Sequence, residues 1–99
     1  MLNLDKKQEQ DKLTVTLEGR LDTTTAPELE KLFQESLPGV TELALDFEKL
    51  DYISSAGLRV LLAAQKIMTK QGSMKLRHVN ESIMEILEVT GFVDILTIE

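Results

Sequence analysis

The 99-residue sequence contains no cysteine and a single histidine. Without cysteine the chain cannot form disulfides, thiolate-ligated zinc sites, iron–sulfur clusters or cysteine nucleophiles. One histidine cannot supply a multi-histidine metal site within one chain. Three phenylalanines, one tyrosine and no tryptophan leave few aromatic rings on which nucleic-acid bases could stack. We therefore expect neither a metal nor a cofactor.

Basic residues are also scarce. Eleven Lys and Arg stand against 17 Asp and Glu, which gives a net charge of −6 at pH 7 and a pI near 4.8. Nucleic acids and anionic membranes carry charge of the same sign, so direct binding to either is disfavoured. No segment approaches the roughly 20 apolar residues of a membrane span, and the charged first residues lack the apolar core of a secretory signal. We expect a cytoplasmic protein without a membrane span.

The composition that is present, 42% apolar and 28% charged, is typical of a globular protein, and the length suits one domain over residues 1–99. Alternating apolar and polar residues predict a short edge strand over residues 2–6 and a strand over residues 12–17, with a turn at 8–11. Thr25 is predicted to be the N-cap of a helix, with Pro27 in its first turn and Glu28 as the capping-box partner. Pro38 and Gly39 end this helix.

The second half of the sequence alternates strands and helices. Its patterns predict strands over residues 42–47, 74–79 and 95–98 and helices over residues 56–71 and 81–90. Asn80 caps the last helix and Gly91 ends it. The order β-β-α-β-α-β-α-β predicts an α/β fold with one mixed sheet, opened by an antiparallel pair and packed against helices.

Two serines, Ser54 and Ser55, stand between a strand and the helix over residues 56–71. A serine at this place commonly caps the helix by accepting hydrogen bonds from its first free amides. The same position also accommodates negative charge, so a phosphate on either serine would be tolerated there. Ala56 and Gly57 lack bulk and would let the active site of a partner approach the hydroxyl. Both interpretations stay open on the residues alone.

A nucleophilic role for Ser55 is disfavoured. A nucleophile elbow requires glycine two residues before the serine, where this chain has Ile53. A triad would need His78 as the base and Asp22 as its orienting acid, whereas a histidine at the end of a strand is typically structural. Glycine-rich phosphate-binding loops are absent as well. The sequence thus favours a protein that is not an enzyme.

Asp22 precedes three threonines and begins the connection from the second strand to the first helix. It is either a turn residue or, with the hydroxyls of Thr23, Thr24 and Thr25, part of a polar docking rim. Loops that follow neighbouring parallel strands gather at one edge of an open sheet. We therefore expect Asp22 to lie close to Ser55.

The helix over residues 56–71 has one predicted core-facing side, made of Gly57, Val60, Leu61, Ala64, Ile67 and Met68. Arg59, Lys66 and Lys70 lie on the opposite side. Leu58 and Leu62 fall outside this stripe. They either widen the buried face or form an apolar patch that receives a partner.

Two motifs together resemble the STAS domain of bacterial anti-sigma-factor antagonists. They are Gly19-Arg20-Leu21-Asp22 and, about thirty residues later, Tyr52-Ile53-Ser54-Ser55-Ala56-Gly57-Leu58. The resemblance extends over about residues 4–98 and includes the turn at Thr90-Gly91-Phe92. It implies a single STAS-like domain.

The resemblance also implies a binding switch. In that family the unmodified protein binds an anti-sigma factor, itself a serine kinase that uses magnesium and ATP, and so frees a sigma factor. The kinase then phosphorylates a serine, by position Ser55 here, which ends binding until a phosphatase resets it. The resemblance further implies that Asp22 lies near the acceptor and helps in the kinase contact. The expected partner-binding residues are Asp22, Thr23, Thr24, Ser54, Ala56, Gly57 and Leu58.

The sequence departs from the family pattern in two places. Many members carry aspartate directly before the phosphorylated serine, where this chain has Ser54 and thus a second candidate acceptor. Many members also have a helix after the last strand, whereas this sequence ends at Glu99. An alternative is a STAS scaffold or ligand-binding module in another signalling or transport complex, which acts without phosphorylation.

Overall fold

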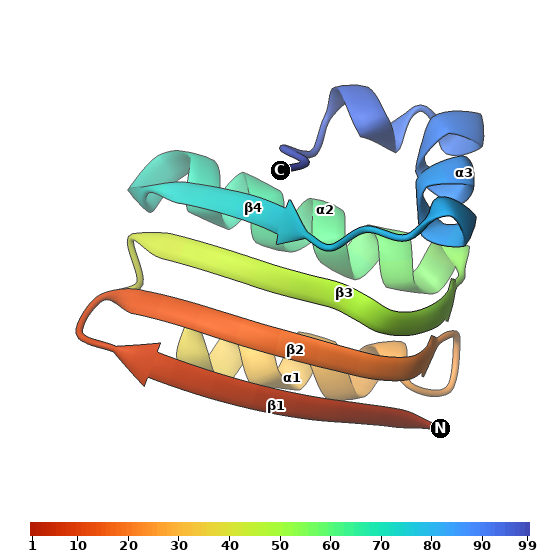
Figure 1. Ribbon diagram of the computed structural model, residues 1–99. Coiled ribbons are helices and arrows are strands. Elements are labelled where there is room, and N and C mark those ends of the chain that lie inside the picture. The colour runs from red at the N-terminus through yellow and green to blue at the C-terminus, as the bar shows by residue number, and fades with distance from the viewer.

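Four strands form one sheet in the order β1-β2-β3-β4 in the computed structural model, which describes residues 1–99 (Figure 1). The strands are β1 (Leu2–Glu9), β2 (Lys12–Leu21), β3 (Glu42–Ile53) and β4 (Ser73–Arg77). β1 pairs with β2 in an antiparallel hairpin, and β2, β3 and β4 are parallel. The predicted α/β fold with a mixed sheet opened by an antiparallel pair is confirmed.

Three helices and a short 3₁₀ turn connect the strands. They are α1 (Ala26–Ser36), α2 (Ser55–Gln71), α3 (Glu81–Thr90) and η1 (Phe92–Asp94). α1 and α2 lie together on one face of the sheet, and α3 and η1 follow the C-terminal end of β4 (Figure 1). None of these helices is both long enough and apolar enough to cross a membrane. The opposite face of the sheet has no covering helix (Figure 1).

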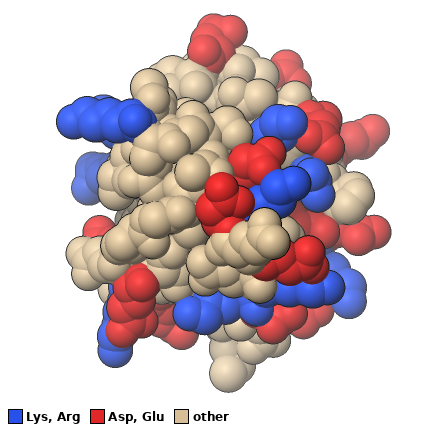
Figure 2. Space-filling model, turned by 90° about the vertical axis from the view of Figure 1, so that its left-hand side faces the viewer, with Lys and Arg blue, Asp and Glu red and all other residues tan.

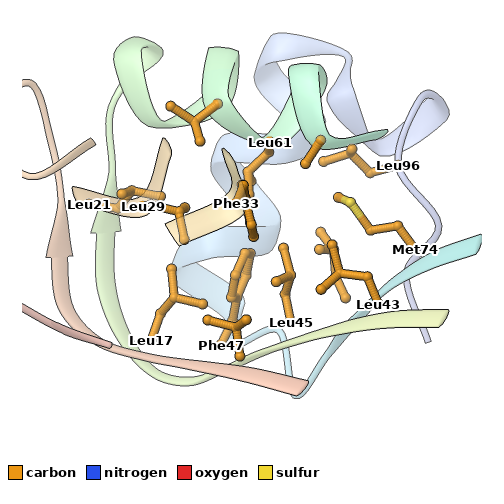
Figure 3. Packing of buried hydrophobic residues seen from close by; sticks show 14 of the residues in the cluster. Leu17, Leu21, Leu29, Phe33, Leu43, Leu45, Phe47, Leu61, Met74 and Leu96 are labelled. Atoms are coloured by element: carbon orange, nitrogen blue, oxygen red, sulfur yellow. The ribbon is translucent and has the colours of Figure 1, made fainter. Parts of the chain in front are cut away.

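The core lies between the sheet and the two helices and contains 25 buried apolar residues. Strand residues point alternately to the two faces, so every second side chain of β4, of β2 up to Leu17 and of β3 up to Phe47 enters this layer. Figure 3 shows them meeting Leu29 and Phe33 of α1 and Leu61 of α2. The fully buried strand residues include Leu13, Val15, Leu17, Leu45, Phe47 and Leu76. The period of two in the sequence thus marks the buried side of the sheet.

The predicted strand over residues 95–98 is wrong. Only Ile98 pairs with Leu76, as an isolated parallel bridge, and the chain before it turns through η1. Two backbone bonds hold this segment, Leu76 N to the Thr97 carbonyl and Glu99 N to the Leu76 carbonyl, both 2.9 Å. Leu96 is 4% exposed and fills the core beside β4. Leu96 and Ile98 therefore pack on the core without a ladder, and no strand follows α3 and η1.

The other strands differ from prediction in length. β1 continues to Glu9 instead of residue 6, and the turn is only Gln10-Asp11, with Gln10 at a φ of 58°. β3 extends to Ile53 because β2 and β3 continue to pair through two register shifts, ending at Leu21 opposite Ile53. β4 stops at Arg77, and His78 takes a left-handed φ of 55°. The longer β2 and β3 carry both polar loops to one end of the sheet.

Candidate functional site

The β2–α1 loop and the β3–α2 loop lie side by side at one end of the sheet (Figure 1). The backbone N–H of Ser54 donates to the carbonyl of Leu21 at 2.8 Å, directly after the last paired residues of the two strands. Asp22 follows Leu21 in the chain, and Ser55 follows Ser54. The structure thus brings the aspartate loop and the serine pair to the same edge.

The two serines have different environments. Ser54 is the N-cap of α2, has extended backbone angles, and its Oγ accepts a hydrogen bond from the Gly57 amide at 3.3 Å. Ser55 is the first residue of the helix, its side chain is exposed, and its hydroxyl makes no hydrogen bond within the chain. Capping therefore belongs to Ser54. The Ser55 hydroxyl stays open to whatever approaches the edge.

Asp22 is held by its own loop. Its Oδ1 accepts hydrogen bonds from the Thr24 hydroxyl at 2.8 Å, the Thr24 amide at 3.0 Å and the Thr25 amide at 3.2 Å. These bonds favour the ionised form, and the pKa of Asp22 is lowered, chiefly by the Thr24 hydroxyl and against a smaller opposing effect of burial. The Arg20 Nε lies 3.9 Å from Oδ2. Asp22 is therefore ionised at neutral pH, with the Arg20 side chain beside it.

The predicted capping box at Thr25 and Glu28 is wrong. Thr25 makes no side-chain cap on α1, because its hydroxyl accepts from the Asp22 amide at 2.8 Å and donates to the Arg20 carbonyl at 2.8 Å. Thr25 is 5% exposed, so it fastens the loop from inside. Asp22 instead accepts from the loop amides ahead of the helix. The signal in the sequence is an aspartate followed by threonines at two and three positions on, a pattern typical of an Asx turn.

Gly57 and Leu58 pack inward. A Cβ on Gly57 would lie 2.7 Å from the Cγ of Leu21 and 3.0 Å from the Cγ1 of Ile53, so the glycine lets α2 sit directly on the ends of β2 and β3. Leu58 is 4% exposed, which answers the open question of its role, because it widens the buried face. Leu62 is half-buried. Ile67, expected in the core, is 45% exposed.

A shallow hollow of about 230 Å³ adjoins the serine pair between the first turns of α1 and α2. Ala56 and Arg59 form its wall on α2, and Thr23 forms part of the opposite wall. Its remaining lining residues are Ala26, Pro27, Glu30 and Val60. The exposed part of the edge thus combines hydroxyls, one aspartate and a small groove.

Sequence reasoning missed one pair at this edge. The Arg20 guanidinium lies 4.4 Å from the centre of the Tyr52 ring, a cation–π contact between the last residues of β2 and β3. Arg20 and Tyr52 are register partners across the parallel pair. The register depends on the two bulges, so the spacing in the sequence could not reveal it.

His78 does not join this edge as a base. Its Nδ1 lies 3.1 Å from the Oδ2 of Asp46, near Glu48, on the outward face of the sheet. A catalytic triad requires a histidine base within hydrogen-bond distance of the serine. His78 is the only histidine of this chain, so no other histidine can take that role.

This sheet, its helices and the polar edge define a class of small α/β domains that expose a serine at the start of a helix. A crystal structure of an anti-sigma factor antagonist from Mycobacterium paratuberculosis has the same fold, with a TM-score of 0.88 at 18% identity over 99% of this chain and 85% of that chain. The phosphorylated form of SpoIIAA from Bacillus gives a TM-score of 0.76 at 15% identity over 98% and 91%.

The family model described as "Mlab, STAS domain" matches residues 4–97. The chain belongs to the STAS domain family, which confirms the resemblance seen in the sequence. It is 33% identical over 99 residues to the anti-sigma-B factor antagonist of Bacillus subtilis (strain 168), which covers 98% of this chain and 90% of that protein.

Proposed function

We propose that this protein is an anti-sigma-factor antagonist, a binding protein and not an enzyme, whose partner affinity is set by phosphorylation of Ser55. One observation carries the proposal. Ser54 caps α2, while the neighbouring Ser55 hydroxyl is exposed and unbonded, beside a loop with an ionised aspartate. A free hydroxyl at an accessible helix start is what a kinase requires of its substrate. The names of the relatives support the function.

The unmodified protein binds an anti-sigma factor and thereby frees a sigma factor. Its binding surface comprises the side chains that the edge exposes, namely those of Thr23, Thr24 and Ser55, with Asp22, Ser54 and Ala56 partly exposed among them. Gly57 and Leu58 contribute from beneath, because their packing sets the position of the helix start. The anti-sigma factor is a serine kinase that brings its own magnesium and ATP, and it acts in the cytoplasm.

Phosphorylation switches binding off by electrostatics. A phosphate on Ser55 adds a charge of about −1.5 to −2 at pH 7, next to the ionised Asp22. The phosphate oxygens are strongly hydrated, so a partner that covered the edge would have to remove their water. The phosphate and the Asp22 carboxylate would also repel each other. A loss of about 3 kcal/mol corresponds to roughly a hundredfold in affinity. SpoIIAA, a structural neighbour, was solved in both unphosphorylated and phosphorylated forms. A phosphatase restores the free serine.

Binding to candidate anti-sigma kinases, with the phosphate located by mass spectrometry, tests the proposal. Wild-type protein should bind and acquire phosphate on Ser55 in the presence of Mg-ATP. Ser55→Asp should weaken binding about a hundredfold, and Ser55→Ala should bind but accept no phosphate. Ser54→Ala is the matched control for the acceptor, which loses the helix cap and should still accept phosphate on Ser55.

Two outcomes contradict the proposal. Phosphate that persists on Ser55→Ala would move the acceptor elsewhere, with Ser54 as the next candidate. Undiminished binding of Ser55→Asp to a stable partner without kinase activity would instead indicate a STAS scaffold that acts without phosphorylation.

A further inference from the structure

The surface formed by α3 and the segment after it is acidic without exception. From Val79 to Glu99 every charged side chain is Asp or Glu, and no Lys or Arg occurs. Glu81, Glu85 and Glu88 are exposed on α3 and recur three to four residues apart, so they share one side of the helix. None of the three forms an ion pair within the chain. This helix therefore presents uncompensated negative charge.

The rest of the surface is arranged differently. On the sheet, several acids are paired with neighbouring bases, as in Lys12–Glu42 at 3.4 Å and Lys75–Glu99 at 3.7 Å. On α1, Lys31 stands in the sequence among the three glutamates of that helix. Figure 2, which views the molecule from the hairpin end, shows basic and acidic side chains intermingled toward the uncovered face of the sheet. α3 thus differs from α1 and from the sheet in having no basic residue among its acids.

Apolar groups lie among the α3 acids. Val89 is 81% exposed, more than any other large apolar side chain except the terminal Met1, and Ile86 is half-buried one turn away. Ser82, Glu85, Ile86, Val89 and Thr90 line a shallow groove of about 380 Å³ along the helix. An exposed valine beside a groove has no packing role in the chain itself. It offers apolar surface to another molecule.

The groove leads toward the end of β3. Ser82 also lines a second hollow with Asp51 and Glu81, and the Asn80 amide fixes the start of α3 by donating to the Leu50 carbonyl at 2.8 Å. Asp51 is exposed and also lacks an ion-pair partner. We call Asp51, Glu81, Glu85, Ile86, Glu88 and Val89 the α3 strip. It is an elongated surface with an apolar groove and a row of acids beside it.

We propose that the α3 strip docks a basic amphipathic helix of a partner protein. Leucine-like side chains of that helix would fill the groove over Ile86 and Val89, and its lysines or arginines would face the row of acids beside the groove. Opposite charge would speed the encounter and fix its direction, while the apolar groove would supply affinity. This surface lies outside the Ser55 edge and goes beyond the proposed function, because docking there needs no phosphorylation.

A synthetic helix tests the docking surface directly. The probe is a capped peptide of about four turns made only of leucine and lysine, with leucine at amphipathic spacing. It is titrated into the full ¹⁵N-labelled chain, and amide shifts are followed by NMR. Saturable shifts should be confined to Asp51 and residues 80–90. Val89→Ser should weaken binding about tenfold, and Glu85→Gln should weaken it several-fold.

Matched variants distinguish binding at the α3 strip from nonspecific attraction of the peptide to acidic or apolar surface elsewhere. Ile67→Ser removes an exposed apolar group from α2, and Glu30→Gln removes an acid that lines the hollow between α1 and α2. Both variants should bind the peptide like wild type. Ser55→Asp should bind the peptide unchanged, which keeps this test independent of the switch. A leucine–glutamate peptide should not bind.

Amide shifts centred on α1, or spread over the whole surface, would overturn the proposal. Equal losses of peptide affinity for Val89→Ser and Ile67→Ser would do the same, as would an absence of binding at low salt. Urea unfolding of each variant verifies that all of them are folded at the temperature of the titration.

Discussion

At the scale of single residues, the two hydroxyls at the start of α2 differ because only one of them meets a helix amide. Ser54 Oγ accepts from the Gly57 amide, and Ser55 Oγ points to solvent. Ser54→Ala should lower the free energy of unfolding by about 1 kcal/mol, the usual cost of losing an N-cap. Ser55→Ala should change it by less than about 0.5 kcal/mol. Urea unfolding of both variants gives the comparison, and equal costs would contradict this division of roles.

The contribution of Asp22 to the stability of the protein depends on pH. The pKa of Asp22 is lowered in the folded chain relative to the usual value of 3.8, because loop hydrogen bonds favour the carboxylate. Its stabilising effect is therefore complete above about pH 5 and is lost as the pH falls below 3.8 through the lower folded value. The stability difference between wild type and Asp22→Asn should be constant near neutrality and shrink in acid. A carboxyl-carbon NMR titration with its midpoint at or above 3.8 would refute this.

At the scale of elements, Gly57 sets how closely α2 approaches the strand ends. Gly57→Ala would place a methyl group 2.7 Å from Leu21 Cγ, and overpacking of this kind typically costs about 1–3 kcal/mol. Alanine is otherwise the better helix former by about 1 kcal/mol. In a Leu21→Ala background, where space is available, the same substitution should therefore cost much less or stabilise. Denaturant unfolding of the double-mutant cycle measures this coupling, and strictly additive effects would rule out the contact.

The elements also show what sequence reasoning can and cannot reach. Periodicity located the buried side of β2 through Leu13, Val15 and Leu17, because alternation and burial are both local to one strand. Asn80 and Gly91 marked the ends of α3, since capping by Asn80 Oδ1 and the left-handed φ of Gly91 follow directly from those residue types.

Predictions failed where a residue depends on a partner far along the chain. Residues 95–98 have the composition of a strand, but a strand requires a neighbouring ladder, and η1 leaves only the bridge from Ile98 to Leu76. Ile67 lies at the rim of the buried face of α2, because that face includes Leu58 and is centred further from Ile67 than the sequence pattern predicted. The place of the polar edge was predictable from the strand–loop order, whereas the Arg20–Tyr52 stack depended on bulges.

At the scale of the whole molecule, all strands and helices share one apolar core, so the chain should unfold in a single cooperative step. Tyr52 is the only tyrosine and tryptophan is absent, so intrinsic fluorescence reports on the end of β3 alone. Far-ultraviolet circular dichroism reports on all helices. The two urea transitions should coincide, and an earlier fluorescence change would show that the polar edge opens before the core.

The separation of capping from exposure at the head of α2 has a consequence for the living cell. Proteins with lowered stability are removed by quality-control proteases, so many mutations act by reducing the amount of protein. Because Ser55 makes no contact that the fold requires, substitutions at this position should leave the steady-state amount unchanged. If the proposed switch operates, such alleles would produce a normal quantity of a regulator fixed in one state. Alleles fixed in the binding state should then act even beside a wild-type copy, whereas alleles fixed in the released state, like those in the core, should be complemented by it.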